Sequence, residues 1–357
     1  MKRSITIINT EIQLINAIEA IHYFGCEENF LVIGQFNFQP KRIQKIENML
    51  KEPLFRQHFK RIIHLPFYFS HKNPLRFIGY ILAYIKFFFL ILFSKKFDFC
   101  FFGVMTDIIV KPIAFLTQYK NPQCELCVID EGIRIIADTL DRVHNQEAII
   151  RQSKKKPLLL QGYYQAITKK WQYPTLTFYS IYQLSLLPQD RLIQNTYVFF
   201  KQNRLSSIRL DNHAVLLIGQ PLFELHLMEL SDYQKIIQQI VEKYKPFPVY
   251  YAPHPIETEY TKWLPDQVTV VKSQYPIELL IMVNQVDALI GFNSTALLNC
   301  ASMGICDNII SISVENNSNT LSSEKAKENQ LQKEMTNLGI NIVSLSFFSE
   351  TQRDNVE

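Results

Sequence analysis

His254 stands in the stretch VYYAPHP, residues 249–255, where the pattern of residue types suggests chemistry. The apolar residues 249–251 predict a buried strand, and Pro253 and Pro255 must end it because proline cannot donate a ladder hydrogen bond. We therefore expect His254 on a turn at the carboxyl end of a strand, the edge at which open α/β sheets bind ligands. An imidazole there could hold a phosphate near physiological pH. The alternative is a turn histidine whose ring bonds nearby backbone.

The tripeptide Asn293-Ser294-Thr295 joins a predicted strand, residues 286–292, to the helical sequence ALLNCASMG. Its two hydroxyls would lie at the positive end of that helix, where the backbone N–H groups of the first turn can bind an anion. The alternative is ordinary N-capping, which any helix can have.

Two further residues belong to the same presumed sheet. Glu278 falls in the first turn of a predicted helix, and Gln220 directly follows a predicted strand. A phosphate could be held by His254, Ser294 and Thr295, and a ribose by the carboxylate of Glu278. This combination is typical of a nucleotide site.

Asp130, Glu131 and Gly132 follow the apolar run at 124–129, which predicts another strand. Two carboxylates and a glycine at a strand's carboxyl end form a second candidate site, which would face the first if two domains closed on each other. The run contains a CxxC pair, but no second Cys or His pair with metal spacing accompanies it. The chain also has no glycine-rich phosphate loop and no DxD motif, so we expect no metal site.

The elements that would position these residues alternate between strand and helix. Thr10 can cap a helix that ends at Gly25, in which isoleucine recurs at helical spacing. Alternation of this kind predicts parallel sheets with helices on both faces. The other predicted strands are residues 5–9, 30–33, 61–65, 97–103, 213–219, 268–271, 307–313 and 341–345. The other predicted helices are residues 41–51, 107–118, a stretch reaching about 171, 276–282, one ending at 338, and one capped by Ser231 and Asp232 that ends near 243.

Charge divides the chain into a basic part and an acidic part. Residues 1–212 carry 28 Lys/Arg and 16 Asp/Glu, net +12, whereas residues 213–357 carry 9 and 17, net −8. This asymmetry in a chain of 357 residues predicts two domains with these bounds. The lysines do not interleave with a nucleic-acid reader motif, so no nucleic-acid partner is expected. Scattered cysteines and the absence of a signal peptide predict the cytoplasm.

Residues 77–94, FIGYILAYIKFFFLILFS, form the most apolar run and contain one charge, Lys86. Three interpretations stay open: a membrane span, a buried core helix, or a helix lying in the membrane interface with lysines toward the headgroups.

The motifs together resemble those of bacterial sialyltransferases, most closely the lipooligosaccharide sialyltransferases of glycosyltransferase family 52. Three short motifs carry the resemblance: an acidic-acidic-glycine motif, an HP motif and a serine/threonine pair, at Asp130-Glu131-Gly132, His254-Pro255 and Ser294-Thr295. The opening NTEIQLINAIEAI, with Gln13, Asn16 and Glu19, also looks like that family's start. The resemblance covers about residues 5–310.

This resemblance implies an α/β protein with a GT-B-type fold, two Rossmann-like domains facing each other across a cleft. Domain 1–212 would bind the acceptor and face the membrane, and domain 213–357 would hold a CMP-sugar. Asp130 would be the catalytic base, with Asp232 in reserve, and His254 would act on the leaving CMP phosphate. The candidate substrate-binding residues are Glu131, Gly132, Pro255, Glu278, Asn293, Ser294, Thr295, Gln13 and Gln220.

The resulting hypothesis is an inverting, metal-independent glycosyltransferase without a cofactor, which moves sialic acid from CMP-sialic acid to a lipooligosaccharide or capsule acceptor. The expected partners are the CMP-sugar, a glycan or glycolipid acceptor and an anionic membrane surface, at the inner face of the cell membrane. A homodimer is compatible with the sequence. The alternatives are transfer of another CMP-activated nonulosonate or of Kdo, a glycosyltransferase using a nucleotide-diphosphate sugar, and a non-catalytic capsule-assembly membrane protein.

Overall fold

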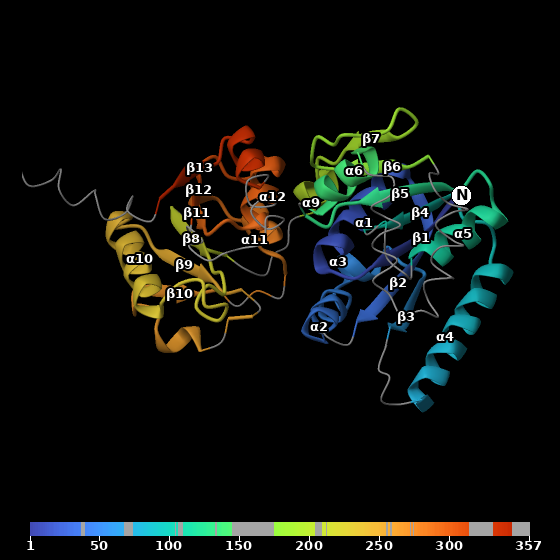
Figure 1. Ribbon diagram of the computed structural model, residues 1–357, viewed down its shortest axis with the longest axis horizontal. Helices are drawn as coiled ribbons and strands as arrows, with labels where there is room; N and C mark the ends of the chain where they lie inside the picture. The colour runs from blue at the N-terminus through green and yellow to red at the C-terminus, as the bar shows by residue number, and fades with distance from the viewer. Residues whose placement is uncertain are drawn as a thin grey trace, which may run out of the picture. The chain divides into compact units, whose positions relative to one another are not determined.

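The computed structural model describes two compact units, Met1–Phe199 and Phe200–Glu357. Figure 1 draws both, and each is described here by itself. The predicted boundary, between residues 212 and 213, falls a little later in the chain. The residues described are 1–36, 40–67, 74–103, 105, 110–132, 134–144, 175–203, 209–211, 213–254, 256–257, 259–271, 273, 275–313 and 331–344.

Unit 1 contains a seven-stranded parallel sheet in the order β3-β2-β1-β4-β5-β6-β7. Strands β2 and β3 are added in turn on one side of β1, and β4 is then added on the other side of β1. The topological switch point therefore lies between β1 and β4. The strands are β1 (Lys2–Ile8), β2 (Cys26–Phe36), β3 (Arg61–Phe67), β4 (Phe99–Phe102), β5 (Glu125–Ile129), β6 (Thr177–Ser180) and β7 (Arg191–Gln194).

The helices of unit 1 connect these strands in the alternation that the sequence predicts. Helix α1 begins where the Thr10 hydroxyl accepts a hydrogen bond from the N–H of Gln13, and it ends at Gly25, whose φ of 63° is left-handed. Residues 145–171 of the predicted basic helical stretch lie outside the described residues. The helices are α1 (Glu11–Phe24), α2 (Pro40–Met49), α3 (Pro53–Arg56), α4 (Pro74–Phe93), α5 (Val110–Lys120), α6 (Arg134–His144) and α9 (Val198–Gln202), which spans the boundary.

Unit 2 contains a six-stranded parallel sheet in the order β10-β9-β8-β11-β12-β13. Its switch point lies between β8 and β11, because the chain builds toward β10 first and toward β13 afterwards. The strands are β8 (Ala214–Ile218), β9 (Val249–Ala252), β10 (Val268–Val270), β11 (Val286–Gly291), β12 (Ile309–Ile312) and β13 (Asn341–Val343).

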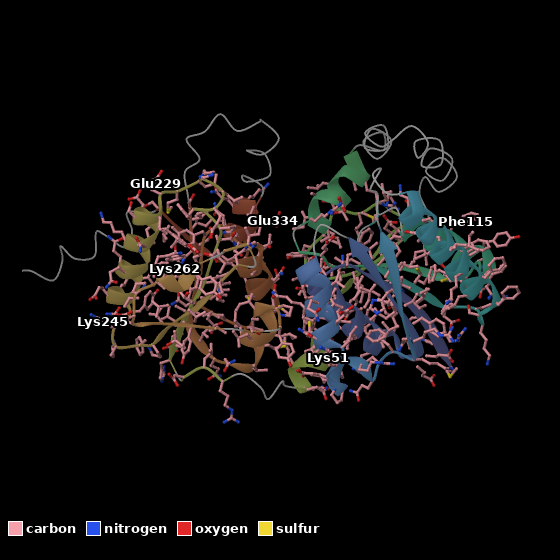
Figure 2. The ribbon with its side chains drawn as sticks, turned by 90° about the horizontal axis from the view of Figure 1, so that it is seen from below. Lys51, Phe115, Glu229, Lys245, Lys262 and Glu334 are labelled. Carbon is pink, nitrogen blue, oxygen red and sulfur yellow. The ribbon has the colours of Figure 1, made fainter. Side chains whose placement is uncertain are left out.

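The helices of unit 2 include one whose predicted cap is wrong. Helix α10 (Leu230–Lys243) begins after Glu229, which is its N-cap residue and is labelled in Figure 2. Ser231 and the exposed Asp232 lie in the helix's first turn instead of capping it, because the helix starts one residue before Ser231. The other helical segments are η1 (Tyr260–Lys262), α11 (Ile277–Val283), α12 (Thr295–Met303) and residues 331–337.

Helix α4, the apolar helix of unit 1, is buried along one face only. Phe87 and Ile91 are buried, whereas Ile85, Phe88 and Phe89 are about half exposed. Among the helices in the described ranges, none is long and apolar enough to cross a membrane. The interpretation as a core helix fits the buried face, whereas Leu82, Ile85, Phe88, Phe89 and Phe93 are exposed large apolar side chains of the same helix.

Candidate active site

The HP turn of unit 2 begins where β9 ends at Ala252. The half-buried ring of His254 accepts a hydrogen bond at Nδ1 from the N–H of Ile256, at 3.2 Å. A neutral imidazole in this arrangement carries its proton on Nε2. The ring therefore bonds nearby backbone, as the alternative interpretation expected, while Nε2–H is the donor through which it could also contact a ligand. Pro255 lies outside the described residues.

Glu257 makes two hydrogen bonds to the backbone of the HP turn. Its N–H donates to the carbonyl oxygen of His254 at 2.9 Å, and its Oε2 accepts a hydrogen bond from the N–H of His254. The carboxylate is only 6% exposed, and burial raises the pKa of Glu257 above its ordinary value. A buried carboxylate is expensive unless it is hydrogen-bonded, so these contacts stabilise the turn.

Two tyrosine hydroxyls connect Glu257 to the end of strand β8. Tyr251 donates to Oε1 of Glu257, which leaves Tyr233 to donate to the Tyr251 oxygen at 3.0 Å. The N–H of Gln220 in turn donates to the Tyr233 hydroxyl at 3.2 Å. Burial raises the pKa of both tyrosines, which keeps the hydroxyls protonated as donors.

Gly219 makes room for this network. A Cβ at this position would lie 2.3 Å from Oε2 of Glu257 and 2.4 Å from the hydroxyl oxygen of Tyr251. Such distances are well inside van der Waals contact, so only glycine allows the carboxylate and the strand to approach so closely.

The Asn293-Ser294-Thr295 turn leads from β11 into α12. Ser294 is the N-cap of α12, and its Oγ accepts a hydrogen bond from the N–H of Ala296 at 3.3 Å. Asn293 has a left-handed φ of 44°, and its N–H donates to the buried Ser311 hydroxyl at 3.3 Å. Ser294 therefore caps the helix, and the exposed Thr295 hydroxyl lies at the same positive helix end.

Glu278 is buried in the first turn of α11. Its Oε1 accepts a hydrogen bond from Nδ2 of Asn299 in α12, at 2.7 Å. This bond ties α11 to α12, so the ribose contact predicted for Glu278 would have to use the remaining lone pairs of the carboxylate.

Sheet order brings these residues of unit 2 to one edge. Strands β9, β8 and β11 are neighbours, and all run parallel, so their carboxyl ends meet at the same edge. His254, Gln220 and Ser294 follow these three strands, and Glu278 begins the helix that leads back into β11. The arrangement surrounds the switch point, where doubly wound sheets bind nucleotides.

Asp130 of unit 1 directly follows β5 and is 1% exposed. Its Oδ2 accepts a hydrogen bond from the N–H of Ile181 at 2.8 Å, whereas its Oδ1 has no partner among the residues that the structure describes. Burial raises the pKa of Asp130 to about 7, against the opposing effect of the hydrogen bonds from Ser180 and Ile181. A carboxyl group that titrates near neutral pH is suited to general base catalysis.

The next two residues have different environments. The Glu131 side chain is 18% exposed, and its Oε2 lies 4.0 Å from a guanidinium nitrogen of Arg134. Gly132 has a left-handed φ of 73°, which explains why glycine follows the two carboxylates, and its carbonyl oxygen accepts the N–H of Ile135 at the start of α6.

Helix α1 contributes buried polar side chains that form hydrogen bonds to the backbone of Asp130 and to segments near it. Nδ2 of Asn16 donates to the carbonyl oxygen of Asp130 at 3.0 Å, and Oδ1 of Asn16 accepts from the Tyr197 hydroxyl and, at 3.2 Å, from Nδ2 of Asn195. Glu19 accepts from the N–H of Phe199 at 3.1 Å. Asn16 and Glu19 thus position backbone segments around Asp130.

Gln13 lies at the switch point of unit 1. Its Oε1 accepts a hydrogen bond from the N–H of Asn9 after β1, at 2.6 Å, and its Nε2 packs against Gly103 after β4. Within the described ranges, this Nε2 is a buried donor without an acceptor. Such a group is costly to bury, which supports Gln13 as a candidate substrate contact.

Sequence reasoning missed Glu257, Asn299 and Asn195. Only Glu257 had a local signal, a carboxylate three residues after His254 that can reach back to the turn's free N–H. The cysteines of the CxxC pair are both buried, and burial raises the pKa of the Cys124 thiol to about 12.

The sequence profile of a family described as Alpha-2,8-polysialyltransferase (POLYST) matches residues 5–313. No curated protein has a significant sequence match to the chain.

Solved structures with two α/β domains resemble the whole chain. A UGT transferase from Siraitia grosvenorii in complex with UDP has a TM-score of 0.52 at 9% identity, covering 99% of this chain and 91% of the other. UGT89C1 from Arabidopsis thaliana, complexed with UDP-L-rhamnose, has a TM-score of 0.51 at 11% identity, covering 99% and 90%. These likenesses show the GT-B fold with its two Rossmann-like domains.

A structure with a different activity shares the same architecture. UDP-GlcNAc 2-epimerase from Neisseria meningitidis, bound to UDP-GlcNAc, has a TM-score of 0.50 at 13% identity, covering 99% of this chain and 100% of the other. The fold alone therefore does not specify the reaction, which must be argued from the site.

Proposed function

The chain belongs to the alpha-2,8-polysialyltransferase family, and on this premise we propose that it transfers sialic acid from CMP-sialic acid to a hydroxyl of a cell-surface glycan. The family name points to an acceptor that itself ends in sialic acid, as in a capsule polymer. The resemblance to lipooligosaccharide sialyltransferases favours the same donor with another acceptor. The single observation that carries the proposal is the carboxylate pair at the end of β5, in which burial brings the pKa of Asp130 to about 7.

The proposed reaction is a single displacement that inverts the anomeric centre. The acceptor oxygen attacks C2 of sialic acid while the bond between C2 and the phosphate oxygen of CMP breaks. The acceptor hydroxyl gives its proton to the carboxylate of Asp130, and the electron pair of the broken bond leaves with CMP. Sialic acid readily forms an oxocarbenium-like centre, so a positioned acceptor, one base and a stabilised leaving group suffice.

His254 and α12 would stabilise the leaving phosphate. Nε2–H is the donor of the neutral His254 ring when Nδ1 accepts from Ile256, and Ser294 and Thr295 lie at the positive end of α12. These groups follow β9 and β11, the two strands on either side of β8, and both groups lie at the carboxyl edge of the sheet, which supports a shared phosphate contact.

Glu131 is a second candidate for the base, favoured by its greater exposure. The Asp130 carboxylate is almost completely buried, whereas the Glu131 side chain is 18% exposed and could meet an acceptor without rearrangement. In this version Asp130 fixes the turn, and Glu131 takes the proton.

The broader proposals rest on the same residues. Transfer of another CMP-activated nonulosonate or of Kdo would use the same phosphate contacts, because these residues do not contact the sugar's substituents in the proposed mechanism. Peripheral association with the inner face of the cell membrane is supported by the exposed aromatic residues of α4 and by the exposed Lys86.

The decisive experiment compares nucleotides as ligands and sugars as donors. CMP should raise the melting temperature because a ligand that binds only the native state stabilises it by mass action, whereas UDP and GDP should not. Incubation with CMP-sialic acid and a sialylated oligosaccharide should then lengthen the acceptor. Stabilisation by UDP alone, or transfer from CMP-Kdo but not from CMP-sialic acid, would overturn the assignment of the donor.

A further inference from the structure

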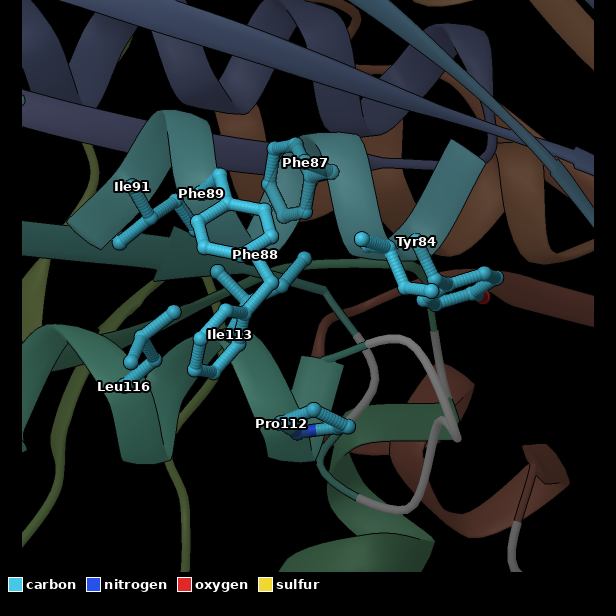
Figure 3. A pocket seen from close by; sticks show the side chains of 9 residues that line it. Tyr84, Phe87, Phe88, Phe89, Ile91, Pro112, Ile113 and Leu116 are labelled. Carbon is cyan, nitrogen blue, oxygen red and sulfur yellow. The ribbon is translucent and has the colours of Figure 1, made fainter. Parts of the chain in front are cut away.

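Helices α4 and α5 line an open apolar pocket of about 560 Å³, and its lining includes no residue of the candidate active site (Figure 3). The volume falls within the range of small-molecule sites, roughly 300–1,000 Å³. Of the lining side chains, only Tyr84 has a polar atom, its hydroxyl. The lining includes Tyr84, Phe88, Phe89 and Ile91 from α4, and Pro112, Ile113 and Leu116 from α5.

A lysine clamp holds the two helices that form the pocket. Lys120, the last residue of α5, donates from Nζ to the carbonyl oxygens of Ile91 at 2.8 Å and Leu92 at 2.6 Å, and also to that of Ser94. Carbonyls in the last turn of a helix lack the N–H partners that a continuing helix would supply. The Ile91 carbonyl also accepts the N–H and the hydroxyl of Ser94, and the ammonium adds a second cap at this end of α4. The clamp fixes the spacing of the helices and keeps the pocket preformed.

The outer wall of the pocket is aromatic and exposed. Phe88 and Phe89, which belong to the lining, are 48% and 49% exposed. Phe93 lies outside the lining and is 79% exposed; its ring stacks on that of Phe89 at 6.0 Å between ring centroids. The floor is buried, with Ile91 and Ile113 almost inaccessible. An exposed apolar patch of this kind marks an interaction site, because removing apolar surface from water is favourable.

The charge around the pocket selects an anionic partner. Residues 53–97 contain eight Lys/Arg and no Asp or Glu. Lys86 is exposed on α4 itself, and Lys95 and Lys96 are exposed just beyond its end. Apolar surface next to several lysines is typical of helices that bind anionic lipid.

The same charges disfavour a second copy of the chain as the occupant. A symmetric dimer would place the same patch on both sides of the interface, so Lys86 would face the lysines of the partner. Like charges in contact repel, and the segment 53–97 supplies no carboxylate to offset them.

We propose that this pocket binds the hydrocarbon chain of an anionic membrane lipid, with the lipid headgroup facing Lys86, Lys95 and Lys96. One chain would leave the bilayer and enter the space between α4 and α5, while the exposed aromatic rings contact its neighbours. The proposal concerns a site outside the candidate active site and does not depend on which sugar is transferred.

The first test measures chain binding without a membrane. Myristate, titrated into the full-length protein in a calorimeter, should bind saturably with one chain per protein, whereas glycerol phosphate should not bind. Phe88→Ala should weaken myristate binding roughly tenfold by removing a wall of the pocket. Phe93→Ala is the matched control: it removes the same side chain from the same helix but not from the lining, so myristate binding should hold.

The second test uses vesicles of phosphatidylglycerol and of phosphatidylcholine. Binding should prefer phosphatidylglycerol, weaken in high salt, and fall for both Phe88→Ala and Lys86→Glu. The proposal that the pocket binds a lipid chain would be overturned if myristate did not bind saturably, or if Phe88→Ala and Phe93→Ala lost myristate affinity equally. A lipid-independent dimer that Phe88→Ala dissolves would also overturn it, because a second copy would then be the occupant.

Discussion

The backbone N–H of His254 donates a hydrogen bond to the buried carboxylate of Glu257, three residues later in the chain. The other oxygen of this carboxylate accepts the hydroxyl of Tyr251. The carboxylate of Glu257 therefore joins the HP turn to the end of β9, although Glu257 contacts no substrate in the proposed chemistry. A residue of this kind acts through another, and it should affect turnover by setting the position of His254.

Glu257→Gln tests this positioning role. Glutamine keeps the size of the side chain but replaces one acceptor oxygen with an NH2 group. This NH2 group, itself a donor, would then face either the N–H of His254 or the hydroxyl of Tyr251, and one native hydrogen bond would be lost. We expect CMP binding to weaken roughly tenfold and unfolding to become easier by about 1–3 kcal/mol, the usual cost of an unmet buried hydrogen bond. CMP affinity by calorimetry and urea denaturation would measure both.

Tyr251→Phe is the control for Glu257→Gln, because it removes one donor to the carboxylate and leaves the His254 contact intact. It should lower stability with a smaller effect on CMP affinity. If Glu257→Gln lost only stability, Glu257 would be a core residue without influence on His254.

Gly219→Ala should disturb the same network by crowding. The added Cβ would lie 2.3 Å from Oε2 of Glu257, so the carboxylate or the strand must shift. Gly291→Ala, at the end of β11 on the same edge, would meet its nearest atoms at an ordinary 3.4 Å. We expect overpacking to cost about 1–3 kcal/mol at Gly219 and less at Gly291. Equal melting temperatures for the two variants would contradict this account.

The raised pKa of Asp130 makes stability depend on pH. In the folded protein the pKa is about 7, and in the unfolded chain it returns toward 3.8, so the native state binds more protons between these values. Native stability should therefore fall as the pH rises from about 4 to about 7, by at most about 4 kcal/mol, and Asp130→Asn should remove this contribution. Urea denaturation would give the free energy of unfolding of both proteins at each pH. If the pKa of Asp130 were ordinary, the two free energies would change with pH in parallel.

Asp130→Asn and His254→Ala should differ in kind. The first removes the proposed base, so turnover should fall by roughly 10²–10⁴-fold while CMP affinity stays unchanged, because the proposed nucleotide contacts all lie in unit 2. The second removes a phosphate contact, so turnover and CMP affinity should both fall. Turnover numbers and CMP dissociation constants would separate them.

Glu131→Gln decides between the two candidate bases. A severe loss of turnover in Glu131→Gln, with Asp130→Asn much closer to wild type, would assign the proton transfer to Glu131. Near wild-type turnover in both would pass the role to Asp232, the reserve candidate, whose exposed side chain lies in the first turn of α10.

Activity should survive chelation of divalent metal ions. In the proposed mechanism the leaving phosphate is stabilised by His254 and the N-terminal end of α12, and the chain has no DxD motif to bridge a metal and a diphosphate. Turnover measured with EDTA should match turnover without it. Loss that manganese restores would show that a metal carries this charge instead.

Much of the fold follows from local pattern. The apolar runs predict the strands β1, β5, β8, β9 and β11. The ends of several elements are predicted by single residues close to them in the sequence. Pro253 ends a strand because it cannot donate a ladder bond, Thr10 and Gly25 bound a helix by capping, and Gly132 permits a left-handed turn. The short motifs likewise show that His254, Ser294 and Asp130 follow strands, since each strand is recognisable from the residues just before it.

Tertiary structure alone decided which polar groups meet. Asn16 reaches the carbonyl of Asp130 across 114 residues of sequence, and Asn299 takes up an oxygen of Glu278. Neither contact has a local signal, because both depend on the order of strands in a sheet and on how helices pack over it. The same reason explains why α4, which is apolar nearly all round, has an exposed face: only packing against α5 and the sheet determines which of its side chains are buried.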